Sequence, residues 1–230
     1  MERPDAAYFA DVAARLDAAS DAADLLRIIA ETAAATAGES CEASVLLRRR
    51  GTLQSAAATT YRASRVDLLA VECGEGAPVL SSLAGDAEPA AVSSGDLASD
   101  ARWQTWGVAA SAAGFRSVLS VSLHARGAMR GVTSVYSGRR DAFAASAREA
   151  LTVLSKHAAI ALAAAALHDD LNQAIDAHTV VGQAQGVLMA TYALTPERAF
   201  EVLRRYSQDR NVKLRALAER VVETRRLPER

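Results

Sequence analysis

Cysteine, proline and aromatic residues are all scarce in this chain of 230 residues. It has two cysteines and five prolines, and aromatic side chains make up 5% of it. Cys41 and Cys73 are too few for a disulfide framework and lie in no cluster with metal-ligand spacing, so we expect buried structural thiols. The longest apolar stretch, residues 158–167, is mostly alanine and shorter than the ~20 residues that cross a bilayer. No signal peptide precedes the first charged residues, so we expect a soluble, cytoplasmic protein without a membrane partner.

Known catalytic motifs are absent as well. The chain has no glycine-rich phosphate loop, no Gly-x-Ser-x-Gly turn and no His-Glu-x-x-His sequence. Its four histidines, at 124, 157, 168 and 178, have no carboxylate or cysteine at ligand spacing. We therefore expect no enzyme activity, no metal and no cofactor.

Charge is nearly balanced over the chain but unevenly spread. The formal net charge is −1, whereas residues 171–230 hold ten Lys or Arg against seven Asp or Glu. The cations gather between residues 204 and 215, which favours an anionic partner for this end. Half of the residues are hydrophobic, which is ample for the cores of one or two domains.

The C-terminal quarter has the pattern of three short amphipathic helices. Apolar residues recur at helical spacing from Ile175 to Leu188. Thr195-Pro196-Glu197 fits a helix start, because Thr caps, Pro suits the first turn and Glu suits the positive end of the dipole. Asn211 is the expected cap of the third helix. The expected inner face of the second helix consists of Ala199, Phe200, Leu203 and Tyr206.

This segment resembles the ANTAR domain, a three-helix module that binds RNA and relieves transcription termination in bacteria. The resemblance runs without gaps from about residue 175 to residue 228 and includes GQA at 182–184, GVLM at 186–189, TPE at 195–197 and KLR at 213–215. It implies paired RNA stem-loops as the partner. The motif positions of the family fall on Ala184, Gly186, Met189 and Ala199, where we expect small residues to let helices pack closely.

The candidate RNA contacts are cations for phosphates and amides for base edges or the 2′-hydroxyl. They are Gln185, Arg204, Arg205, Gln208, Arg210, Asn211 and Lys213. The alternative is a solvated helix face with ion pairs such as Glu201–Arg205. Many ANTAR domains carry a basic residue where His178 and Gln185 stand here, and an acidic-basic pair where Ala190-Thr191 stand. The loss of three basic positions predicts fewer phosphate contacts and a flatter salt dependence.

The front of the chain reads as mixed α and β. Residues 21–37 have an amphipathic helical pattern, and strand patterns occupy residues 43–48, 52–59, 117–125 and 129–136. Turns at 49–51 and 126–127 make two hairpins, so we expect an antiparallel sheet covered by helices.

This order of elements resembles a GAF domain, a small-molecule sensor fold, over most of residues 15–165. The similar fragments include CGEGAPVL, DLASDARWQTW and GFRSVLSVSLHARGAMRGVTSVYS. The fold implies a pocket between sheet and loops for an unidentified ligand. Trp103 and Trp106 either close that pocket or plug their loop onto the core.

Residues 142–176 lack glycine and proline and are rich in alanine, which predicts a long helix between the two domains. Its irregular heptads do not support a long coiled coil, but its apolar seam predicts a homodimer. The alternative is a helix folded back on its own sheet, which we expect for its first half. The seam consists of Leu151, Leu154, Ile160, Leu167, Leu171 and Ile175.

The sequence therefore predicts an α+β chain with a GAF-like sensory domain at 1–145, a connecting helix at 146–174 and a three-helix ANTAR bundle at 175–230. The predicted function is a signal-responsive regulator of transcription antitermination that binds RNA hairpins as a homodimer. Two alternatives stay open: a sensory or scaffold dimer whose C-terminal bundle binds a protein, and a DNA-binding regulator.

Overall fold

The computed structural model describes residues 4–83 and 90–227. They form two units with separate cores, Met1–Ala165 and Ala166–Arg230. The architecture is the predicted α+β class, with a five-stranded antiparallel sheet, flanking helices, a long helix and further C-terminal helices. The three-part division stays a prediction, because one helix, α6 (Ala145–Tyr192), contains both of its internal boundaries.

The sheet has the strand order β2-β1-β5-β4-β3, and every neighbouring pair is antiparallel. Both predicted hairpins, β1–β2 and β4–β5, are confirmed. Their turns have positive φ at two successive residues, Arg50 and Gly51 (51° and 86°) and Arg126 and Gly127 (54° and 69°). Such turns match the twist of the flanking strands, and this explains the tight connections. The strands are β1 (Glu42–Arg49), β2 (Thr52–Ala58), β3 (Ala91–Ser94), β4 (Ser117–Ala125) and β5 (Ala128–Ser137).

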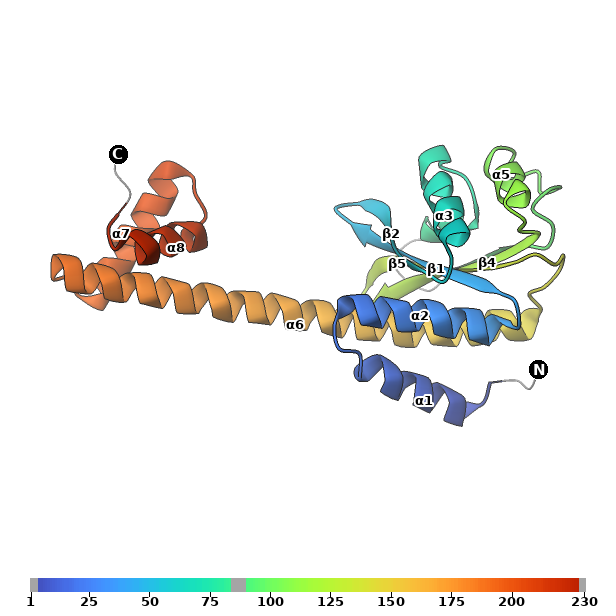
Figure 1. Cartoon of the computed structure of the whole chain (residues 1–230), viewed down its shortest axis with the longest axis horizontal. Coiled ribbons are helices and arrows are strands. Elements are labelled where there is room, and N and C mark those ends of the chain that lie inside the picture. Colours follow the sequence, from blue (N-terminus) through green and yellow to red (C-terminus); the bar gives the residue numbers. More distant parts are fainter. Residues whose placement is uncertain (1–3, 84–89, 228–230) are drawn as a thin grey trace. The chain divides into compact units, whose positions relative to one another are not determined.

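Helices cover both faces of this sheet. Figure 1 shows α1, α2 and the first part of α6 on one face, and α3 and α5 on the other. Each face has its own apolar cluster, so the central strands are buried on both sides. The helices are α1 (Ala6–Asp17), α2 (Ala22–Ala37), α3 (Tyr61–Cys73), α4 (Ala77–Ser82) and α5 (Trp106–Ala112).

Serine at alternate positions of β4 does not mark a solvent face. Leu119 and Val121 contribute to the cluster beneath α2 and α6, whereas Val118 contributes to the cluster beneath α3 and α5. The serines between them are buried too, and Ser120 Oγ lies 2.8 Å from Ser134 Oγ on the neighbouring strand. The sheet thus places a seam of hydroxyl groups inside the molecule.

Helix α6 is longer than predicted. The sequence pattern ended one helix at residue 176 and began another near residue 175, whereas the structure has a single helix from Ala145 to Tyr192. Gly182 and Gly186 lie within it, because a glycine costs a helix only about 1 kcal/mol relative to alanine and does not end it.

By length and composition alone, α6 is apolar enough to cross a membrane. This differs from the expectation from the sequence, because the many alanines make a long window apolar without large side chains. Buried core helices of soluble proteins pass the same test. Leu151, Leu154 and Ala158 of α6 are completely buried against the sheet.

The C-terminal unit is built from the end of α6, α7 (Pro196–Arg210) and α8 (Leu214–Thr224). Phe200 is a correction to the predicted inner face of α7, because it is 39% exposed while Ala199 and Leu203 are completely buried. Phe200 points about 100° round the helix from Ala199, and this places its ring beyond the buried side of α7. The buried core consists of Val181, Ala184, Leu188, Ala199, Leu203, Leu217, Ala218 and Val221.

Candidate functional site

Helix α7 carries most of the predicted RNA contacts, and local sequence determines where it begins and ends. Thr195 Oγ1 accepts a hydrogen bond from the Arg198 N–H at 3.4 Å, which confirms the predicted start. Asn211 differs from its prediction, because it ends α7 in a left-handed conformation with φ 50°. Lys213 occupies the N-cap position of α8 instead. Asparagine tolerates the left-handed conformation better than most residues, and this suits it to the end of a helix.

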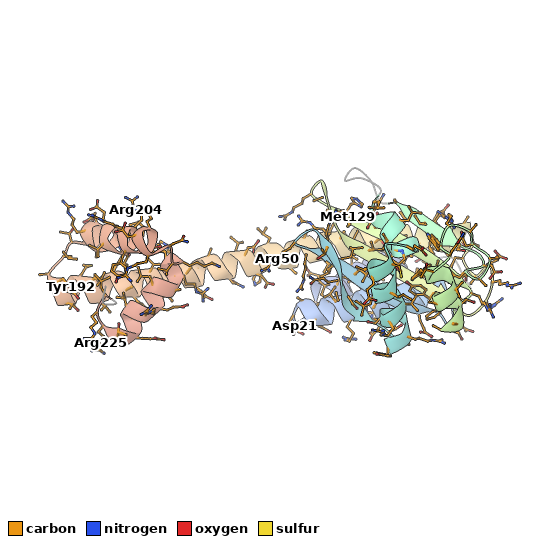
Figure 2. The ribbon with its side chains drawn as sticks, turned by 90° about the horizontal axis from the view of Figure 1, so that it is seen from above. Asp21, Arg50, Met129, Tyr192, Arg204 and Arg225 are labelled. Carbon is orange, nitrogen blue, oxygen red and sulfur yellow. The ribbon has the colours of Figure 1, made fainter. Side chains whose placement is uncertain are left out.

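The predicted arginine contacts lie in three different surroundings. Arg205 pairs with Asp209 across 3.7 Å, and the Arg210 guanidinium lies 5.2 Å from the ring centroid of Tyr206. Arg204 projects from α7 into solvent (Figure 2). Over residues 4–83 and 90–227, no carboxylate pairs with it. Arg204 is therefore the arginine of this group whose charge is available for a phosphate.

The expected ion pair between Glu201 and Arg205 is not formed. Glu201 Oε2 instead accepts a hydrogen bond from Arg198 at 2.9 Å. Both side chains of this pair are exposed, and exposed i, i+3 pairs stabilise a helix by only about 0.5 kcal/mol. The pair matters here because it directs the Glu201 carboxylate toward Arg198 and away from Arg204.

The four polar candidates divide into one bridging residue and three exposed ones. Gln185 Nε2 donates a hydrogen bond to the Pro196 carbonyl oxygen at 3.1 Å, so this side chain joins α6 to the start of α7. Gln208, Asn211 and Lys213 are exposed around the turn between α7 and α8. The structure thus places three of the four near the cations of that turn.

The four motif residues have unequal roles in packing. Ala184 and Ala199 are completely buried in the C-terminal core, and Met189 packs partly against it. Gly186 is exposed, and a Cβ built on it would meet nothing within 4 Å. Close packing within the chain therefore accounts for the two alanines and leaves the glycine unexplained.

Gly186→Ala is expected to stabilise the C-terminal unit by about 1 kcal/mol, because alanine is the better helix former and the space is open. Chemical denaturation followed by circular dichroism measures this. If an RNA backbone approaches the glycine, the same variant weakens RNA binding while raising stability. A variant that lowers stability would contradict the open surroundings of Gly186.

The two tryptophans of the N-terminal unit lie edge to face, with ring centroids 5.2 Å apart. Trp106 opens α5 instead of lying on a loop, is completely buried, and donates from Nε1 to the Val66 carbonyl oxygen at 2.9 Å. A Cβ on Gly76 would lie 2.7 Å from the Trp106 ring, so only glycine fits there. Glu75 accepts hydrogen bonds from the backbone N–H groups of Thr105 and Trp106, at 2.9 and 3.0 Å, and so holds this turn to the start of α5.

Beneath these rings lies a buried polar pair that the sequence did not reveal. Asp67 on α3 and Tyr136 on β5 are completely inaccessible, and the Tyr136 hydroxyl donates to Asp67 Oδ1. Burial raises the pKa of Asp67 to about 6, and the hydroxyls of Ser44 and Tyr136 limit that rise. Burial and the adjacent Asp67 raise the pKa of Tyr136 well above its usual value. A lone aspartate in an amphipathic pattern gives no sign of this, because its partner is sixty-nine residues away.

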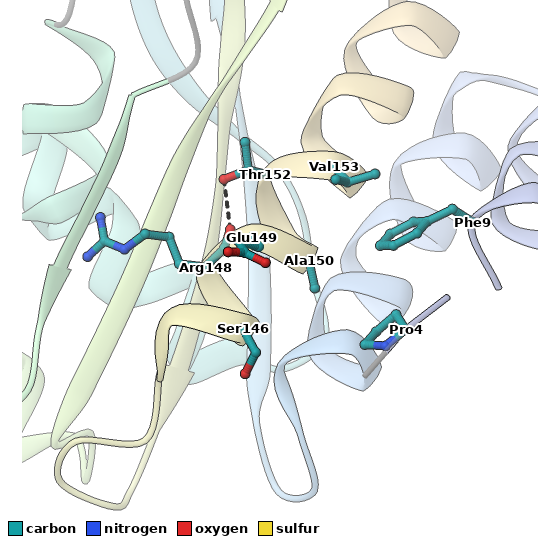
Figure 3. A pocket seen from close by; sticks show the side chains of 8 residues that line it. All are labelled: Pro4, Phe9, Ser146, Arg148, Glu149, Ala150, Thr152 and Val153. Carbon is teal, nitrogen blue, oxygen red and sulfur yellow. Dashed lines mark hydrogen bonds between the residues drawn. The ribbon is translucent and has the colours of Figure 1, made fainter. Parts of the chain in front are cut away.

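Two of the pockets in the N-terminal unit adjoin aromatic side chains. One of about 360 Å³ adjoins Trp103, whose ring lies under the Arg102 guanidinium with 4.3 Å between Cζ and centroid. The other, of about 400 Å³, lies between α1 and α6 and is lined by Phe9 and Val153 among others (Figure 3). The aromatic wall and cation of the first make it the better site for a small molecule.

The cysteines differ from their prediction in part. Cys41 is half-buried, and burial raises the pKa of its thiol. Cys73, expected to be buried, is exposed, because it is the last residue of α3 and lies beyond Ala70, the last buried residue of that helix. Within the described ranges, no three His, Cys, Asp or Glu side chains are grouped as metal ligands.

Two protein families match this chain, in the order that the sequence predicts. Residues 19–163 match the GAF domain, and residues 169–222 match the ANTAR domain. GAF and ANTAR domains are typical of soluble proteins, and ANTAR domains are known as RNA-binding modules of antitermination regulators.

Solved structures with a similar fold are remote in sequence. The GAF domain of a phosphoenolpyruvate-protein phosphotransferase from Coxiella burnetii is 14% identical with a TM-score of 0.53, and the match covers 70% of this chain and 94% of that chain. Its counterpart from Acinetobacter is 14% identical with a TM-score of 0.52, covering 69% and 92%. A bacteriophytochrome from R. palustris is 12% identical with a TM-score of 0.58, covering 78% of this chain and 41% of that chain. Such identities show the fold alone. No curated protein matches the chain.

Proposed function

Because this chain belongs to the GAF domain family and carries an ANTAR domain behind its GAF domain, we propose that it is a signal-responsive regulator of transcription antitermination. In this proposal the chain is a cytoplasmic homodimer without enzyme activity. Its ANTAR bundle binds paired hairpins in nascent RNA, and binding competes with folding of a terminator. The observation that carries the proposal is the ANTAR match on a bundle whose α7 presents Arg204 to solvent, with no carboxylate of residues 4–83 or 90–227 paired to it.

The chemistry of the α7–α8 turn supports an RNA partner. Arg204 has a charge that no carboxylate in the described part of the chain neutralises, and Lys213 is exposed at the start of α8. Gln208 and Asn211 lie between them in the sequence and offer amide donors and acceptors. Cations bind phosphates and fix register, while amides read base edges or the 2′-hydroxyl.

The pocket beside Trp103 supports a sensory role for the GAF domain. Its volume of about 360 Å³ falls in the range of small-molecule sites, and Arg102 and Glu75 place opposite charges on its rim. A ligand there regulates the ANTAR bundle only if it binds one arrangement of the dimer more tightly than another. The GAF signal is therefore a small molecule with differential affinity for two states.

An exposed apolar stripe on α6 supports the homodimer. Leu167, Leu171 and Ile175 recur every four residues and are 42%, 54% and 62% exposed. Large apolar side chains in a row at this spacing form one face of a helix, and solvation of that face is unfavourable. A second copy of the same helix buries the stripe.

Binding of the purified full chain to a two-hairpin RNA tests the function. The control RNA keeps both stems and scrambles both loops, and a salt series accompanies each titration. Loop-dependent binding that survives excess duplex DNA supports the proposal. Equal binding to both RNAs contradicts it and favours a protein partner, whereas competition by duplex DNA favours the DNA-binding alternative.

Arg204→Ala is expected to weaken RNA binding roughly fivefold at about 0.15 M salt and to reduce the slope of log K against log salt by about one phosphate contact. Arg205→Ala is the matched control, because its guanidinium already pairs with Asp209 on the same helix. We expect a smaller loss from the control. A larger loss from Arg205→Ala than from Arg204→Ala would mean that the other face of α7 meets the RNA.

A further inference from the structure

Phe200 is a large aromatic residue on the outside of the C-terminal unit. It is 39% exposed and is not among the side chains that pack on the core of that unit. The adjacent Ala199 is completely buried, as is Leu203. The fold therefore does not use Phe200 as a core residue, although an exposed phenyl ring on a short helix is unfavourable in water.

Three polar side chains continue the face of Phe200 along α7. Arg204 and Gln208 follow it by four and eight residues, which places these three on one side of the helix, and Asn211 is the C-cap residue just beyond Gln208. We call these four residues the outer stripe of α7. All are exposed, and successive members of the stripe lie about 5–6 Å apart.

The ion pairs of α7 do not neutralise the positive charge of Arg204 in this stripe. Arg198 pairs with Glu201 and Arg205 with Asp209, and none of these four residues belongs to the stripe. Glu197 and Glu201 are the acids nearest this side of the helix. Glu201 pairs with Arg198, and Glu197 lies at the first turn, where it suits the positive end of the dipole. The outer stripe thus consists of one aromatic ring, one unpaired cation and two amides.

We propose that Phe200 is a stacking platform for an unpaired base in the loop of the bound RNA hairpin. Arg204 then binds the adjacent phosphate, and Gln208 and Asn211 face the edge of the base. This inference rests on the proposed function and assigns the contact that reads the loop. Bases within an A-form stem are stacked on their neighbours, so a side-chain ring gains access only to a base of the loop.

The composition of the stripe favours RNA over a protein surface. A ring beside an arginine and two amides is the combination that single-stranded nucleic acids meet in proteins: stacking for the base, charge for the phosphate and hydrogen bonds for the base edge. A site for a protein helix requires a row of apolar side chains. Phe200 is the only apolar member of the outer stripe.

The test compares three variants of the full chain on two RNAs. Phe200→Ala removes the ring, Phe200→Leu keeps apolar volume without a π-face, and Phe200→Tyr keeps the ring. One RNA carries 2-aminopurine in its loops, and the other has the same stems with abasic loops. Thermal unfolding checks that each variant folds, which the exposure of Phe200 leads us to expect. Light scattering measures the oligomeric state of each.

Phe200→Ala and Phe200→Leu are both expected to weaken binding to the base-containing loop about 5- to 150-fold, the range for loss of one base stack. Phe200→Tyr is expected to bind within about threefold of the wild type. On abasic loops all variants are expected to bind alike. Only the wild type and Phe200→Tyr are expected to quench the 2-aminopurine fluorescence.

If Phe200→Leu binds and quenches like the wild type, the stacking inference is wrong while the RNA function stands. If Phe200→Ala dissociates the dimer, the stripe belongs to a second copy and the inference is overturned. If the wild type shows no loop-dependent binding, the proposed function fails as well.

Discussion

Asp67→Asn is expected to stabilise the N-terminal unit by roughly 3 kcal/mol at pH 7.5, with a gain that shrinks toward zero near pH 4. In the wild type, ionised Asp67 is completely buried and its Oδ1 accepts from Tyr136, whereas its Oδ2 has no hydrogen-bond partner of normal geometry among the described residues. The Ser44 hydroxyl lies beside the carboxyl group and also lacks a partner of normal geometry. An asparagine keeps the acceptor for Tyr136, carries no charge, and turns its amide toward Ser44.

The stabilisation expected from Asp67→Asn at neutral pH follows from the raised pKa of Asp67. Burial raises the pKa of Asp67 in the folded state to about 6, from 3.8 for a solvated aspartate. The neutral acid is therefore favoured by folding, and its contribution to stability is present below about pH 4 and lost as the pH rises through about 6. Two pKa units correspond to roughly 3 kcal/mol. The difference in unfolding free energy between Asp67→Asn and the wild type should grow as the pH rises from about 4 and become constant above about 6.

Urea unfolding followed by tryptophan fluorescence measures this effect in the full chain. Both tryptophans of the protein, Trp103 and Trp106, are buried in the N-terminal unit, so the probe is insensitive to the C-terminal unit. Asp17→Asn, on the exposed side of α1, is the charge-matched control. A difference between Asp67→Asn and the wild type that is equal at pH 4.5 and pH 7.5 would show that Asp67 does not titrate in this window.

Replacing Leu171 and Ile175 together by glutamine is expected to convert the dimer into a monomer. The loss of the second ANTAR bundle should reduce affinity for a two-hairpin RNA by a factor of about 10² to 10⁴, because two linked sites lose their avidity. Affinity for a single hairpin should stay unchanged, since the two positions lie outside α7 and α8. Glutamine is a good helix former, so α6 itself remains intact.

Sedimentation equilibrium and paired titrations with one-hairpin and two-hairpin RNA provide the measurement. Asp169→Gln with Asp176→Gln is the control, because it places the same two side chains at exposed positions on the side of α6 opposite the apolar stripe. The control should remain a dimer with full avidity. A double-glutamine variant of Leu171 and Ile175 that remains a dimer would show that other contacts join the two copies.

The outer stripe and the exposed stripe of α6 have a common physical basis. Both are faces of helices that keep large side chains in solvent although the core of the C-terminal unit is complete without them. The polar stripe of α7 suits an anionic partner, and the apolar stripe of α6 suits a second copy of the chain. A regulator that binds paired hairpins requires both surfaces.

Sequence by itself determined the features that depend on near neighbours. The two hairpins follow from alternating patterns around turns that tolerate positive φ, and the start of α7 follows from Thr195 and Pro196. The resemblance to GAF and ANTAR domains was also readable, because it rests on residues at fixed spacing. The side chains named for RNA binding lie in the C-terminal unit, and their role stays a prediction.

Only the tertiary structure decided the features that depend on distant partners. A helical pattern shows that one face of α7 is buried, but not that the boundary passes between Ala199 and Phe200. The charge of Arg204 is available because Glu201, three residues before it, pairs with Arg198 instead, and sequence spacing allows Glu201 to pair with Arg198, Arg204 or Arg205 at similar energy. The pKa of Asp67 depends on the burial of its α3 face against the sheet and on Tyr136, sixty-nine residues away. Short-range propensities select the elements, whereas burial and pairing are settled when all of them pack together.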